Sequence, residues 1–174
     1  MQNFCNRVPA FRQFDLQFSP THLGGGTHPG TYVVPVSLAL GEQYRRSGKE
    51  VVTAIAVGYE AAQRMAIAAG PGLGANGFRT VPTIGVFGAV AFAAVLSRLD
   101  TGQFAAALNF AANMACGLTQ CFGDGTMEVY LHAGLAARAG ITAASLCWSW
   151  WRSRARHTRR ARWVLPYVLP RPLL

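Results

Sequence analysis

Residues 80–97 read TVPTIGVFGAVAFAAVLS, eighteen consecutive positions without a charged side chain. A segment that is apolar on every side is either the buried central helix of a helical domain or a membrane-spanning helix, and this one is long enough to span. Glycine and alanine dilute its hydrophobicity, and the next segment carries Gln103, Asn109 and Asn113, which are costly in lipid. The sequence therefore favours a central buried helix, with a membrane protein as the less favoured alternative.

The segment before it predicts an amphipathic helix from Glu50 to Gly70, which Gly70-Pro71-Gly72 is expected to end. Glu60 and Arg64 form a favourable i,i+4 pair on its exposed face. The apolar residues recur at spacings of three and four, which places them on one face: Val51, Ile55, Tyr59, Ala62 and Ala66.

Three further helices are predicted, from Val33 to Gly48, from Thr101 as the N-cap to Cys121, and from about Leu131 to Cys147. No segment has a convincing strand pattern. The predicted fold class is all-α, a partial helical bundle of five helices over residues 33–147, preceded by a loop over residues 1–32. The many alanines and glycines indicate close approach of the helices.

Residues 148–174 differ in composition from the rest of the chain, and all four tryptophans lie in or next to this tail. Without seven of its arginines the remaining 9 basic and 7 acidic residues give a net charge of +2, where the whole chain has +9. The seven are Arg152, Arg154, Arg156, Arg159, Arg160, Arg162 and Arg171. We interpret the tail as translation in a shifted reading frame; the functional alternative is a tail that binds RNA or a membrane surface.

The four cysteines, Cys5, Cys116, Cys121 and Cys147, form no CxxC pair, and no His/Cys spacing suits zinc. No metal site is therefore predicted. Cys116 and Cys121 lie in an alanine-rich stretch and are expected to be buried free thiols. Residues 1–20 lack the continuous apolar core of a secretory signal peptide, so a reducing cytoplasmic location is expected.

Local signatures in this order resemble the MmgE/PrpD family, which includes 2-methylcitrate dehydratase and cis-aconitate decarboxylase. They are THPG at 27–30 followed by VPVSLAL at 34–40, GFRT at 77–80 followed by GVFGAVA at 85–91, and LHAGLAARAG at 131–140. The helix that contains Gly58-Tyr59-Glu60 also resembles the family, so the likeness spans roughly residues 14–147.

The resemblance implies part of the helical domain of a lyase or isomerase that acts on a small di- or tricarboxylic acid without a metal or organic cofactor. The first helices and the smaller α+β domain of a full-length member are not expected in this chain. A homodimer is implied for the full-length family, whereas nucleic acid and membrane are not expected as partners.

Such chemistry needs cations that hold carboxylates and an acid/base group beside them. His28 lies in a glycine-rich loop at a helix start, where the helix N-terminus favours an anion, and the resemblance assigns it the catalytic acid/base role. Residues 18–22, Phe-Ser-Pro-Thr-His, resemble the family's FDDTH element, so Thr21 and His22 are predicted to contact substrate. The structural alternative for all three is an ordinary turn residue.

Ser19 and Pro20 stand where the FDDTH element has its acidic pair, and two further positions depart from the family pattern. A family histidine is replaced by Arg79, which stays protonated and cannot act as a base but can clamp a carboxylate, so it is predicted to bind substrate. A family lysine is replaced by Val129, while His132 is retained and is expected to be structural. These departures leave open a non-catalytic helical fragment with an exposed apolar face, or a binder that acts through the basic tail.

Overall fold

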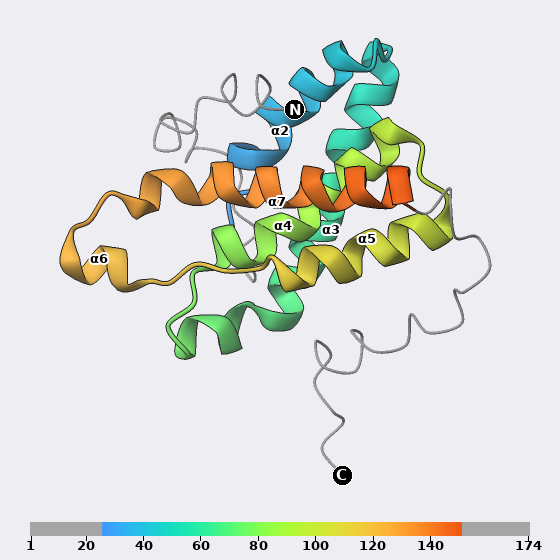
Figure 1. The fold of residues 1–174 in the computed structure, drawn as a ribbon. Coiled ribbons are helices and arrows are strands. Elements are labelled where there is room, and N and C mark those ends of the chain that lie inside the picture. Colours follow the sequence, from blue (N-terminus) through green and yellow to red (C-terminus); the bar gives the residue numbers. More distant parts are fainter. Residues whose placement is uncertain (1–25, 151–174) are drawn as a thin grey trace.

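The computed structural model describes residues 26–150, and these form six helices (Figure 1). The helices are α2 (Gly30–Gln43), α3 (Gly48–Ala75), α4 (Thr80–Ser97), α5 (Thr101–Asn113), α6 (Gln120–Asp124) and α7 (Glu128–Trp150). Within this part of the chain, β structure is limited to one isolated antiparallel bridge between Phe78 and Leu118. The predicted all-α fold class is confirmed.

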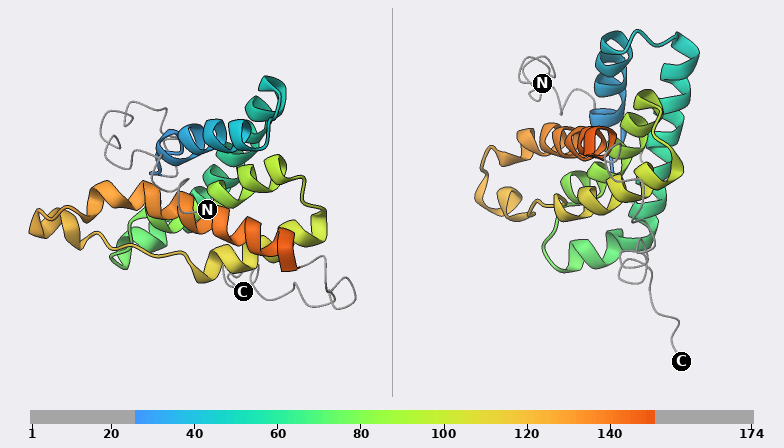
Figure 2. Two further views of the ribbon diagram at one scale, coloured as in Figure 1. Left: turned by 45° about the horizontal axis from the view of Figure 1, so that its top comes forward. Right: turned by 45° about the vertical axis from the view of Figure 1, so that its right-hand side comes forward.

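Helix α4 is the centre of the domain, as expected from its uniformly apolar sequence. It packs most extensively against α3 and α7, which lie on different sides of it, and it also contacts α2 and α5 (Figures 1 and 2). By length and mean hydropathy, 1.8, it is the one helix of the described chain that could cross a membrane, but 83% of it is buried inside the domain. Its apolar sides are covered by neighbouring helices.

Glycines set the distances between α4 and its neighbours. A Cβ atom on Gly88 would lie 3.0 Å from the Gly58 carbonyl oxygen of α3, and one on Gly140 of α7 would lie 2.6 Å from the Val90 backbone nitrogen. Both approaches bring backbone against backbone; the one at Gly140 is closer than real Cβ atoms tolerate, and the one at Gly88 lies at that limit. The small residues noted in the sequence are therefore the crossing points of α3, α4 and α7.

Helix α3 begins with a capping box, in which the Ser47 hydroxyl accepts a hydrogen bond from the Glu50 N–H and the Glu50 carboxylate accepts one from the Ser47 N–H. The predicted end at Gly70 is wrong, because the helix continues through Pro71 to Ala75. Proline removes a single helical hydrogen bond. The Asn76 side chain then donates to the Gly72 carbonyl and helps to end the helix there.

Other predicted boundaries also change. Helix α2 ends at Gln43, and Gly48, predicted as its last residue, instead starts α3. The turn between them contains Arg45 in the left-handed region, with φ of 51°. The side chain of Asp100, and not of Thr101, caps α5 through a hydrogen bond with Gln103. A carboxylate is a good N-cap, so α5 starts one residue earlier than it would with Thr101 as the N-cap.

The helix predicted from Thr101 to Cys121 is two helices, because α5 ends at Asn113 and the chain is extended around Gly117 before α6. Gly117 has φ of +127°, and a Cβ atom there would clash with the Pro82 ring, so this position requires glycine. Cys116 is exposed in this segment, contrary to expectation, whereas Cys121 and Cys147 are buried. All three described cysteines are free.

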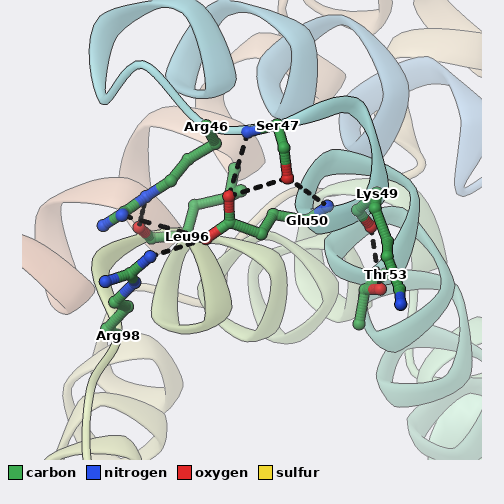
Figure 3. Close-up of polar contacts among 7 residues, drawn as sticks. All are labelled: Arg46, Ser47, Lys49, Glu50, Thr53, Leu96 and Arg98. Carbon is green, nitrogen blue, oxygen red and sulfur yellow. Dashed lines mark hydrogen bonds and ion pairs between the residues drawn. The ribbon is translucent and has the colours of Figure 1, made fainter.

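The C-terminal end of α4 is tied to the turn between α2 and α3 by charged groups (Figure 3). The Arg98 guanidinium donates to the Glu50 carboxylate at 2.9 Å, and Arg46 Nε donates to the Leu96 carbonyl at 2.9 Å. Hydrogen bonds from Arg98 and from the backbone and side chain of Ser47 lower the pKa of Glu50 to about 2. This partly exposed cluster fixes the turn to the central helix.

Candidate functional site

The first turns of α2, α4 and α7 lie on the same side of the domain (Figures 1 and 2). His28 lies two residues before α2, Arg79 is the N-cap residue of α4, and His132 lies near the start of α7. The Thr80 hydroxyl donates to the Gly26 carbonyl at 2.6 Å, which joins the His28 loop to the start of α4. Helix N-termini carry partial positive charge, so their convergence favours an anion.

Arg79 is 7% exposed and is held from both its backbone and its side chain. Its N–H donates to the Gly117 carbonyl at 3.1 Å, within the bridge formed by Phe78 and Leu118. Its Nη1 donates to the Val129 carbonyl at 3.1 Å. Positions 79 and 129, which both depart from the family pattern, are therefore in direct contact.

His132 is the second side chain beside this guanidinium. Its Nδ1 lies 3.0 Å from Arg79 Nη1, and its side chain is buried with the residue only 5% exposed. Burial first, and then the charge of Arg79, lower the pKa of His132, while Glu128 acts in the opposite direction. The imidazole is therefore held in its neutral form.

The loop that carries His28 is held on both sides of the histidine. The Thr31 hydroxyl donates to the His28 carbonyl at 2.7 Å, and the hydroxyls of Thr27 and Tyr32 pair at 3.3 Å. Thr27 and Tyr32 are almost completely buried. Burial first, and then the charge of Arg79, lower the pKa of His28, so the two side chains share one electrostatic environment.

The structure thus gathers two of the four residues predicted for the site, His28 and Arg79, and adds His132 to them. Thr21 and His22 lie outside the described residues. The sequence did not indicate that Thr27 and Tyr32 support the loop or that Phe122 covers Arg79, with its ring centroid 5.0 Å from the guanidinium carbon. The only sequence signal for the support of the loop was the presence of hydroxyl groups on both sides of His28.

No group of three or more His, Cys, Asp or Glu side chains within residues 26–150 could hold a metal ion. The groups present are a half-buried imidazole whose pKa is lowered and an arginine held near it at converging helix ends. An arginine of this kind can bind an anionic substrate, and a neutral imidazole can accept a proton from that substrate.

The domain is all-α, and its candidate site residues lie at or near the N-terminal ends of three helices. The MmgE/PrpD N-terminal domain model matches residues 10–149, and the chain belongs to this dehydratase- and lyase-like family. No curated protein matches the chain significantly.

Proposed function

We propose that this domain binds a small di- or tricarboxylate and serves a lyase or isomerase reaction on it. The observation that carries the proposal is the buried guanidinium of Arg79, which the Val129 carbonyl and His132 hold at the end of α4 that is tied to the His28 loop. The charge of Arg79 also lowers the pKa of His28. The same positive environment, reinforced by three helix N-termini, favours a substrate with several negative charges.

In this proposal Arg79 holds a carboxylate and His28 removes a proton from the carbon next to it. The electron pair of the broken C–H bond moves toward the held carboxylate, where the guanidinium stabilises the added charge. The pair then expels a β-hydroxyl as water in a dehydration, with the proton supplied by His28, or recaptures a proton in an isomerisation. No metal or organic cofactor is expected, and Thr21 and His22 remain predicted substrate contacts.

The proposal is tested by thermal unfolding of the full chain with citrate, cis-aconitate or 2-methylcitrate. At a concentration about 100 times the dissociation constant, binding stabilises a protein by about 2.7 kcal/mol, which raises the unfolding temperature of a chain of this size by about 5 °C or more. Arg79→Gln should abolish the shift. Arg98→Gln is the matched control, because it removes the same charge at the other end of α4 and should leave the shift intact.

A folded sample that shows no shift with any of these acids would overturn the proposal. An equal shift in the Arg79→Gln and wild-type chains would place binding elsewhere. Turnover is measured separately, by following consumption of each acid.

A non-catalytic helical domain is the second candidate, favoured by apolar side chains exposed on and beside α6 and the first half of α7. They are Leu118, Phe122, Met127, Leu131 and Leu135, all at least 44% exposed. Monomeric soluble proteins rarely expose large contiguous apolar patches. Carboxylate binding without turnover by the full chain would favour this candidate.

A further inference from the structure

The guanidinium of Arg79 is oriented by two acceptors that both come from the start of α7. Nη1 lies 3.1 Å from the Val129 carbonyl oxygen and 3.0 Å from His132 Nδ1. The Phe122 ring lies over the guanidinium at 5.0 Å. The two acceptors on one nitrogen and the neighbouring ring constrain the position of this cation.

The chemistry of the contact sets the protonation state of the imidazole. A guanidinium nitrogen has hydrogens to donate and no lone pair, so His132 Nδ1 must be the acceptor and the ring proton must lie on Nε2. An imidazolium has a hydrogen on both nitrogens and could not accept this bond. It would also place a second positive charge 3.0 Å from the first.

We propose that His132 is a positioning residue, whose neutral imidazole aims the Arg79 guanidinium and whose protonation releases it. His132 acts through Arg79 and not on the substrate, which distinguishes it from His28. The consequence for carboxylate binding rests on the proposed function, whereas the positioning of Arg79 does not.

The charged and titratable groups around His132 come from three other elements and from α7 itself. Arg79 at the start of α4 opposes protonation, and Glu128 on α7 favours it. His28, before α2, and Cys121, on α6, are linked to the pair through Arg79. Burial and Arg79 outweigh Glu128, which agrees with the neutral ring that the hydrogen bond requires.

The direct test uses the full chain without a ligand. Guanidinium resonances of Arg79, assigned through Arg79→Gln, are followed by ¹⁵N NMR from pH 8 to pH 5, together with the His132 ring nitrogens. We expect an ordered Arg79 and an Nε2–H tautomer at pH 8, and loss of the ordered guanidinium signals as His132 protonates.

Two variants separate positioning from simple packing. His132→Asn keeps an acceptor oxygen near the place of Nδ1 but cannot titrate, so Arg79 should stay ordered across the whole pH range. His132→Leu removes the acceptor, so Arg79 should lose its order at every pH. If the leucine variant does not fold, the asparagine variant and the wild-type titration still decide the question.

An Arg79 that stays ordered when His132 is protonated, or an asparagine variant that loses order with the wild-type pH dependence, would overturn the proposal. Citrate binding gives the functional consequence. Relative to His132→Asn, the wild-type chain should bind citrate about tenfold more weakly at the pH where His132 is protonated, and about equally at pH 8. Because both proteins are compared at the same pH, and so with the same protonation state of citrate, the ratio of their affinities does not depend on the titration of citrate.

The two proposals can fail separately. If Arg79 follows the protonation of His132 but no carboxylate binds at any pH, the positioning role stands and the proposed function fails. If carboxylates bind with an affinity that Arg79→Gln weakens but His132→Leu does not change, the proposed function stands and the positioning role fails.

Discussion

At its C-terminal end, α4 is joined to the α2–α3 turn by charged side chains that are partly exposed, whereas its N-terminal end is joined to α7 by a buried arginine. In the first cluster, the Glu50 carboxylate binds Arg98 and the two donors of Ser47 (Figure 3). In the second, Arg79 donates to a carbonyl and to an imidazole nitrogen, neither of which carries a formal charge.

The two ends of α4 have different roles, because one is part of the scaffold and the other belongs to the candidate site. Charges of opposite sign that satisfy one another at the surface hold a turn in place and contribute modestly to stability. The guanidinium of Arg79 donates to a carbonyl and an imidazole nitrogen of α7, and its positive charge lowers the pKa of His28. The same helix therefore has a structural end and an end suited to an anion.

The largest expected effect on stability comes from the contact between α7 and α4 at Gly140. Gly140→Ala places a methyl group against the backbone of α4 at Ala89 and Val90, which should reduce the free energy of unfolding by about 3 kcal/mol. Denaturant unfolding measures it. Gly72→Ala is the control, because nothing lies within 4 Å of its added Cβ, and it should stabilise α3 by about 0.5 kcal/mol. Equal effects of the two changes would contradict close backbone packing at Gly140.

The next effect contrasts the two arginines. Arg79→Gln removes a buried charge-assisted donor and should cost about 2 kcal/mol, because it leaves the buried His132 Nδ1 without this donor. Arg98→Gln removes an exposed partner of Glu50 and should cost about 0.5 kcal/mol. Chemical denaturation of both variants checks the order. A larger loss for Arg98→Gln would reverse the assignment of the two ends.

A smaller effect is expected at the capping box. Ser47→Ala removes the side-chain acceptor for the Glu50 N–H and should cost about 1 kcal/mol of unfolding free energy. Because the cap lies at the opposite end of α4 from Arg79, the dissociation constant for citrate should not change. Calorimetry measures both quantities, and a variant with weakened citrate binding would show that the ends are coupled.

The smallest effect is the pH dependence, which should separate the two ends. The lowered pKa values of His28 and His132 mean that the unfolded chain takes up protons first, so stability falls as the pH drops below 6.5. Glu50, with a pKa lowered to about 2, stabilises the fold above pH 4.5 and loses this contribution as the pH approaches 2.

Unfolding free energies measured from pH 8 to pH 3 report both the histidine contribution and the Glu50 contribution. His132→Asn should reduce the dependence below pH 6.5 and leave the contribution of His28. Glu50→Gln should reduce only the part below pH 4.5, where Glu128 also contributes. If Glu50→Gln altered the upper part, the separation of the two clusters would be wrong.

The helices themselves were largely predictable, because their apolar periodicity is a local property of the chain. The uniformly apolar segment 80–97 became the central helix, and Glu50 became part of a cap. The errors lie at helix ends. Pro71 did not end α3, and Asp100 replaced Thr101 as a cap, because helix ends depend on side-chain hydrogen bonds whose geometry a pattern does not contain.

The candidate site was predictable in its residue types but not in its contacts. His28 and Arg79 were chosen from their positions in motifs that resemble the family, and both remain predictions until binding is measured. His132 was expected to be structural, yet it contacts Arg79 across more than fifty positions of sequence. A contact over such a separation depends on how α4 and α7 cross, which no local pattern reveals.

The sequence alone thus determined an all-α domain, its family and the residue types near the site, because periodicity and short motifs are written locally. Only the tertiary structure decided that the first turns of α2, α4 and α7 converge. Glycine contacts support this arrangement, because Gly85 of α4 lies against Tyr32 of α2 and Ala136 of α7, and Gly140 of α7 lies against the α4 backbone at Ala89 and Val90. The same crossing of α4 and α7 brings Arg79 against Val129 and His132 and so gives the domain its buried cation.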